Sequence, residues 1–141
     1  LWTQELVTYT GKWHRLSDTG INPLPIQRPI PIWLGGHHEN VLKRVARFGA
    51  GWMPNYRYPQ QAATSIAKIN RYMQEAGRDP QELGIEARIY YGGGEPGVWM
   101  ETLAAWKEAG ATHASFNTMG AGFKTAKEHL TAIEVFAKLA L

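Results

Sequence analysis

The chain has 141 residues, of which 44% are hydrophobic and 19% charged, a composition typical of a folded globular protein. The net charge is +3, from 15 Lys and Arg residues and 12 Asp and Glu residues. These residues are interspersed, so the chain has no basic run of the kind that favours nucleic-acid binding. No apolar run approaches the roughly 18 residues of a membrane span, and the absence of cysteine excludes disulfides and suits a reducing compartment. We therefore expect a cytoplasmic protein with no nucleic acid and no membrane among its partners, although the first residue, Leu1, is not methionine and leaves a preceding targeting peptide open.

Residues 1–28 are the least regular part of the chain and predict a small hairpin followed by a proline-rich lead-in. Two stretches rich in β-forming residues, 5–9 and 12–16, lie on either side of Gly11. The prolines that follow keep the chain extended: Pro23, Pro25, Pro29 and Pro31. We interpret this part as an ordered excursion of a single domain, whose main part is residues 29–141.

Residues 29–55 predict a strand, a helix and a second strand in succession. A short apolar run over 30–34, between prolines and glycines, indicates a buried strand. A helical pattern follows, with an apolar face that comprises Val41, Leu42, Val45, Ala46 and Phe48. A second short strand is predicted over 52–54. This order makes a βαβ unit, whose two strands are parallel.

The same order of elements continues to the end of the chain. Helices are predicted over 59–76 and 96–110, and strands over 85–91 and 112–118. A capping box at 125–128 begins a closing helix, whose inward residues we expect to be Leu130, Ile133, Ala137 and Ala140. The order strand, glycine, helix occurs about four times, which predicts an α/β fold with a parallel sheet and helices outside it.

Three predicted strands end in glycine clusters: Gly35-Gly36, Gly92-Gly93-Gly94, and Gly120 with Gly122. The carboxyl ends of parallel strands share one edge of a sheet, where α/β proteins bind ligands. Glycine lets a ligand approach the backbone, and the first amides of a following helix favour an anion. We therefore favour a phosphate site over the alternative that these glycines only make tight turns. Barrels often bind phosphate through the loops after their last two strands, here 92–97 and 118–122.

Other polar residues predict neither a metal site nor a nucleophile paired with a base. His37, His38 and Glu39 are adjacent but lack a His-x-x-x-His spacing, so we expect His37 to contact a ligand or cap the helix. Glu86 and Arg88 share a strand face, and we predict that they pair with each other, the alternative being that both meet solvent. A further set on one strand face is interpreted as the polar lining of a barrel interior: His113, Ser115 and Asn117.

Four of these motifs, taken in order, resemble a known family over nearly the whole chain. They are Pro-Ile-Trp-Leu-Gly-Gly-His at 31–37, Gly-Trp-Met-Pro at 51–54, the triple glycine at 92–94, and Asn-Thr-Met-Gly-Ala-Gly at 117–122. Together they are similar to the bacterial luciferase-like flavin monooxygenase family, and most of all to its deazaflavin-dependent oxidoreductase branch. Members are (β/α)8 barrels that use FMN or the deazaflavin coenzyme F420 to reduce or oxygenate small organic substrates. The resemblance implies a flavin- or deazaflavin-dependent oxidoreductase or monooxygenase.

The resemblance also implies the part of the barrel that the chain forms. It corresponds to half of a (β/α)8 TIM barrel, from the fifth strand to the last helix, with about four parallel strands each followed by a helix. The implied cofactor-binding residues surround the phosphate or ribityl arm: Gly35, Gly36, His37, Gly92, Gly93, Gly94, Asn117, Thr118, Met119 and Gly120. No position matches a residue that the resemblance would make catalytic.

Half a barrel departs from the family in one physical respect. A complete barrel takes about 250 residues, and half of one exposes two sheet edges and an unfilled interior. We therefore predict a homodimer, in which two copies cover each other's open side. A fragment of a longer enzyme is the rival explanation. The functional alternatives are a non-catalytic half-barrel that binds at most a flavin or phosphate ligand, and a generic phosphosugar-binding barrel.

Overall fold

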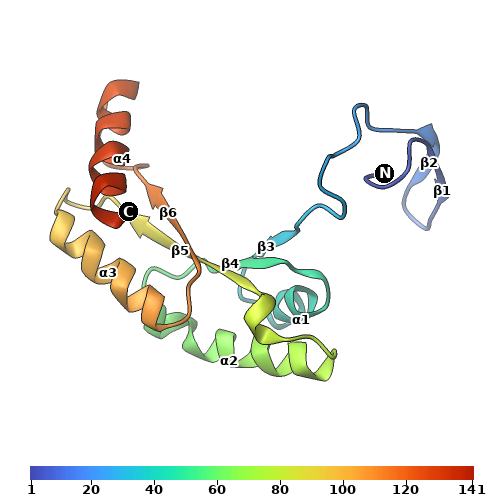
Figure 1. Cartoon of the computed structure of the whole chain (residues 1–141), viewed down its shortest axis with the longest axis horizontal. Helices are drawn as coiled ribbons and strands as arrows, with labels where there is room; N and C mark the ends of the chain where they lie inside the picture. The colour runs from blue at the N-terminus through green and yellow to red at the C-terminus, as the bar shows by residue number, and fades with distance from the viewer. The chain divides into compact units, whose positions relative to one another are not determined.

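The computed structural model describes residues 1–141, and the chain divides into two units, Leu1–Pro31 and Ile32–Leu141 (Figure 1). The first unit holds the predicted hairpin, in which β1 (Val7–Thr10) pairs antiparallel with β2 (Arg15–Thr19). The Gly11 amide donates to the His14 carbonyl across the turn, at 2.9 Å. No residue of this unit is buried, so the hairpin has no core of its own.

The second unit is a parallel sheet of four strands in the order β3-β4-β5-β6. These strands are β3 (Trp33–Gly35), β4 (Gly51–Met53), β5 (Gly84–Tyr90) and β6 (His113–Asn117). Each is followed by a helix: α1 (Glu39–Phe48), α2 (Pro59–Glu75), α3 (Pro96–Glu108) and α4 (Ala126–Ala140), with a short 3-10 turn, η1 (Pro80–Glu82), before β5. The predicted α/β alternation with a parallel sheet is therefore confirmed. No helix is both long and apolar enough to cross a membrane.

The two faces of the sheet differ in chemistry because successive side chains of a strand point to opposite sides. The core lies between one face of the sheet and the helices. The sheet contributes the buried side chains of Trp52, Ile85, Ala87 and Ile89, and α3 contributes Trp99 and Trp106. The other face is polar at β5 and β6. There the Ser115 hydroxyl donates to Glu86 Oε1 at 2.5 Å, and Arg88 Nη2 lies 3.2 Å from Glu86 Oε2. The predicted Glu86–Arg88 pair is thus confirmed, with Ser115 as a third member.

Trp33 covers part of this polar face. Its indole ring lies over Gly51 and Gly84, where any Cβ would overlap the ring. The ring also meets the His113 imidazole edge-on, with centroids 4.8 Å apart. Two neighbouring strands therefore need glycine opposite Trp33, which lets this large side chain lie flat on the sheet.

The closing helix begins as predicted, but only part of its predicted inward face is covered: Ala137 and Ala140 are half-buried, and Ala140 packs against the core. Thr125 and Glu128 form the expected capping box. Leu130 and Ile133, however, are 59% and 42% exposed, whereas Ala132 and Phe136 are the buried residues of α4. Phe136 stacks on Phe116 of β6 with ring centroids 4.3 Å apart. Since the sheet ends at β6, no further element covers the flank of α4 that carries Leu130 and Ile133.

Phe48 also departs from the predicted apolar face of α1. It is exposed at the end of the helix, where the Arg47 guanidinium lies 4.9 Å from the centre of its ring. The buried residues of α1 are Leu42, Val45 and Ala46.

Candidate functional site

The three predicted glycine turns lie at the same edge of the sheet. Strands β3, β5 and β6 belong to one sheet, and each pairs in parallel with its neighbours. Their carboxyl ends therefore point the same way, and each is followed at once by one of the turns. The geometry on which the predicted anion site depends is present.

The turn after β3 is fixed by a tryptophan of the next strand. Gly36 adopts a φ of 106°, a region that favours glycine, and its carbonyl accepts a 2.7 Å hydrogen bond from Trp52 Nε1. The helix cap is His38, whose Nδ1 accepts from the Asn40 amide at 3.3 Å, and not His37. His37 is exposed, with its ring centroid 5.5 Å from that of Tyr56, and is left free to contact a ligand.

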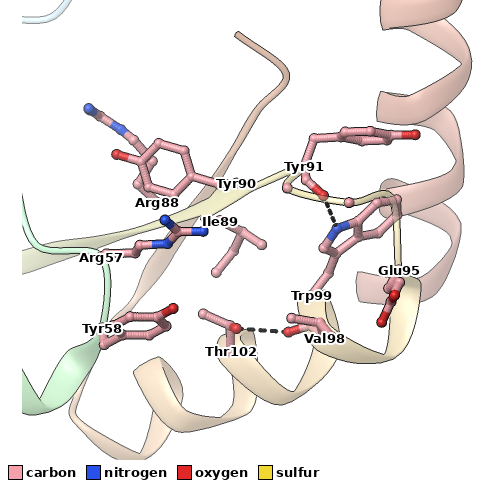
Figure 2. Close-up of a pocket in the computed structure, with 12 residues that line it drawn as sticks. Arg57, Tyr58, Arg88, Ile89, Tyr90, Tyr91, Glu95, Val98, Trp99 and Thr102 are labelled. Atoms are coloured by element: carbon pink, nitrogen blue, oxygen red, sulfur yellow. Dashed lines mark hydrogen bonds between the residues drawn. The ribbon is translucent and has the colours of Figure 1, made fainter. Parts of the chain in front are cut away.

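The turn after β5 is held in a similar way. The Tyr91 carbonyl accepts a 2.8 Å hydrogen bond from Trp99 Nε1 (Figure 2). The Tyr91 amide donates to the Asn117 carbonyl at 2.9 Å. The amides of Gly92 and Gly93 donate no hydrogen bond within the chain. This turn therefore presents two unused backbone donors at the edge of the sheet.

The turn after β6 uses two of its predicted ligand residues internally. Asn117 Oδ1 accepts from the Met119 amide at 2.8 Å, and the buried Thr118 hydroxyl lies 2.7 Å from His129 Nδ1 on α4. The Met119 side chain is exposed. Neither the Thr118 amide nor the Gly120 amide donates a hydrogen bond within the chain. The groups that this turn leaves free for a ligand are therefore mainly backbone amides.

Two of the three turns meet around one hollow of ≈ 450 Å³. Its lining residues come from the ends of β4, β5 and β6: Asn55, Arg57, Tyr90, Gly92, Met119, Gly120 and Ala121. The turn that carries Gly35, Gly36 and His37 does not line this hollow and lies beside β4 instead. The structure thus brings together the second and third predicted clusters and places the first next to them along the edge.

Arg57 is a candidate residue that the sequence analysis missed. It lines the hollow and forms no salt bridge with any carboxylate. Its guanidinium carbon lies 5.8 Å from the ring centre of Tyr58 and 6.0 Å from that of Tyr90. The available signal was its position in the loop after β4, since charged residues at the carboxyl ends of parallel strands often bind ligands.

A second, smaller hollow of ≈ 270 Å³ adjoins the first and shares Arg57, Tyr90 and Gly92 with it. Figure 2 shows the Arg57 side chain between the rings of Tyr90 and Tyr58, with Trp99 on the opposite side of the hollow. The remaining lining is mostly apolar or aromatic, including Ile89, Tyr91 and Val98. Its charged and polar members are Arg88, Glu95 and Thr102. An unpaired cation and free amides thus stand beside a space that suits apolar groups.

The profile of the luciferase-like monooxygenase family matches residues 1–135. The chain is 36% identical over 86 residues to an uncharacterized protein of Mycobacterium tuberculosis, an alignment that covers 60% of this chain and 29% of the relative. It is 29% identical over 90 residues to the F420-dependent hydroxymycolic acid dehydrogenase of the same species, which covers 64% of this chain and 24% of the relative.

The fold is similar to that of a solved F420-dependent secondary alcohol dehydrogenase in complex with an F420-acetone adduct. The TM-score is 0.54 at 17% identity, and the match covers 99% of this chain and 49% of that chain. Each alignment thus spans less than a third of the length of the two sequence relatives and about half of the solved structure.

Proposed function

The chain belongs to the luciferase-like monooxygenase family, and from this membership we propose that it is an oxidoreductase that binds FMN or the deazaflavin coenzyme F420. The resemblance found in the sequence motifs is confirmed, and the four parallel strands with their helices form half of the family's (β/α)8 barrel. Relatives named for F420 support the deazaflavin, and the family as a whole supports a flavin, so the proposal keeps both. A cytoplasmic location is part of the same proposal.

The observation that carries the proposal is the hollow between the second and third turns. The amides of Gly92 and Gly120 line it without an internal hydrogen-bond partner, and Arg57 adds an unpaired guanidinium. Amide donors that need no rearrangement, together with a cation, are what a phosphate group requires. We place the cofactor phosphate there.

In this proposal the other predicted residues contact the cofactor or shape the turns that bind it. Gly35, Gly36 and His37 contact the ribityl arm or the ring from the neighbouring turn. Gly93 and Gly94 shape the second turn, while Asn117, Thr118 and Met119 shape the third. When bound, the reduced cofactor supplies a hydride to the substrate, or a flavin activates oxygen. This chain's residues hold the cofactor and exclude water from one side of it.

A non-catalytic half-barrel that forms a homodimer is the second candidate. Strands β3 and β6 each have one unpaired edge, and the exposed Leu130 and Ile133 extend an apolar surface beside β6. Unpaired edges and exposed apolar side chains both favour association. In this candidate the dimer binds a flavin or phosphate ligand without turnover.

Titration of the protein with FMN and with F420, followed by absorbance and fluorescence, tests the proposal. Arg57→Gln should weaken binding about tenfold or more, because a charge-assisted hydrogen bond to phosphate is lost. Arg44→Gln, a change of the same kind at an exposed position of α1, should leave affinity unchanged. Binding of neither cofactor would refute the proposal.

Turnover separates the two candidates. Bleaching of the bound cofactor by a reductant, followed by reoxidation with candidate carbonyl substrates or oxygen, is expected of the enzyme. Tight binding without any turnover would favour the non-catalytic half-barrel. Binding of a sugar phosphate without either cofactor would favour the phosphosugar barrel instead.

A further inference from the structure

We propose that Trp52 and Trp99 are positioning residues, each of which fixes one cofactor-binding turn through a hydrogen bond from its indole N–H to a backbone carbonyl of that turn. The inference rests on the proposed function, because it assigns these two bonds a role in cofactor affinity. Neither residue lines the hollow in which the phosphate is placed, and only Trp99 lines the smaller hollow beside it.

Trp52 joins the first turn to the core. Its side chain is fully buried, with 0% of its surface exposed, and packs among the helices as part of β4. Its Nε1 donates to the Gly36 carbonyl at 2.7 Å. A ring locked by close packing cannot follow a moving turn, so the bond holds Gly36 in its φ of 106°.

Trp99, on helix α3, holds the second turn in the same way. It belongs to α3 and is 3% exposed, and its Nε1 donates to the Tyr91 carbonyl at 2.8 Å (Figure 2). The amide of Tyr91 in turn donates to the Asn117 carbonyl, at the start of the third turn. The Trp99 bond therefore fixes the wall of the hollow that carries Gly92 and, through β6, supports the wall that carries Gly120.

A third buried tryptophan shows that burial alone does not give an indole N–H a hydrogen-bond partner in this protein. Trp106 is 0% exposed, and its Nε1 has no hydrogen-bond partner in the structure. It lies seven residues, or about two turns, further along α3 than Trp99, away from the carboxyl ends of the strands. The core thus tolerates an unbonded indole, and the bonded ones are those that reach the glycine turns. Trp106 supplies a control of equal size and burial.

The test replaces each indole by benzothienylalanine, an isostere with sulfur in place of the N–H, and by phenylalanine as the genetically simpler change. Loss of the donor at position 52 or 99 should weaken FMN or F420 binding about three- to tenfold. The same isostere at position 106 should leave affinity unchanged. Thermal melting of every variant reports whether the core is intact.

A second readout uses the unmodified protein and needs no variant to fold. In a proton–nitrogen NMR spectrum, cofactor titration should shift the indole N–H signals of Trp52 and Trp99 and leave that of Trp106 in place. Equal loss of affinity at all three positions, or unmoved signals of Trp52 and Trp99 on saturation, would overturn the inference. Failure of the wild-type protein to bind either cofactor would refute the proposed function itself, and this role with it.

Discussion

Glu39 links α1 to α2, the first two helices that cover the sheet. Its carboxylate accepts hydrogen bonds from the Tyr72 hydroxyl and from Lys68 Nζ, the latter at 2.9 Å, so the first turn of α1 is tied to α2. The Tyr72 hydrogen bond first, and the Lys68 ammonium second, lower the pKa of Glu39 from 4.5 to about 2. Both partners stabilise the ionised form, so protonation of Glu39 costs the folded state more than the unfolded state.

This lowered pKa predicts a specific loss of stability in acid. The contribution of Glu39 is fully present above pH 4.5 and is lost as the pH falls from there towards 2. In urea unfolding measured at several pH values, the wild-type midpoint should therefore fall more steeply over this range than the midpoint of Glu39→Gln. Glu134→Gln serves as the control, because Glu134 is exposed on α4 and forms no hydrogen bond or ion pair in the structure, and its pH dependence should match the wild type. Parallel curves for wild type and Glu39→Gln would contradict the assignment.

Strands β3, β4 and β5 are joined on their polar face by one side chain, Trp33. Since its ring occupies the space where a Cβ at position 51 would lie, Gly51→Ala should destabilise the fold by about 1–3 kcal/mol, the usual cost of overpacking. In a Trp33→Ala background the ring is absent, so Gly51→Ala should then change the free energy of unfolding very little. A double-mutant cycle measured by chemical denaturation gives the coupling directly.

Gly97→Ala is the matched change at a site with open space, where no atom lies within 4 Å of the added methyl. Because Gly97 lies inside α3, alanine there should be neutral or stabilising, by up to about 1 kcal/mol. A cost at Gly51 that persists in the Trp33→Ala background would show that the ring is not the cause.

The elements that the sequence predicted correctly are those whose signals are local. Alternating patterns, glycine turns and the 125–128 capping box depend on neighbouring residues only, and all are found in the structure. Two of the four residues predicted to face inward from α4, Leu130 and Ile133, are exposed, because they fit an apolar stripe while burial depends on which elements lie next to the helix. A periodic pattern cannot show that the sheet ends at β6.

The candidate site was predictable in outline for the same reason. Glycine clusters after three parallel strands had to share an edge, and they do. Arg57 was missed because no short pattern marks it, and the hydroxyl of Thr118 was not expected to pair with His129, eleven residues away. Contacts between distant segments decide which side chains of a turn face a ligand.

The four-stranded unit leaves an open surface on the side of β6. A groove of ≈ 580 Å³ runs between β6, α3 and α4, lined by Phe116, Ile133 and Leu141 among other residues. The far edge of the sheet, at β3, is also unpaired. Two copies related by a two-fold axis would pair β6 of each with β3 of the other in parallel, which removes both edges and closes an eight-stranded barrel.

Closure of the barrel by two copies predicts a homodimer. Its stability should depend on the exposed apolar side chains of α4. Analytical ultracentrifugation should give the wild type twice the 15.8 kDa of one chain. Ile133→Lys should shift the distribution towards the single chain, because a charge buried at the apolar contact without a partner is costly. Thr131→Lys adds the same charge to α4 beside a different hollow, shared with α3, and should leave the dimer intact. A wild-type protein that sediments only as one chain at all concentrations would show that two copies do not close the barrel.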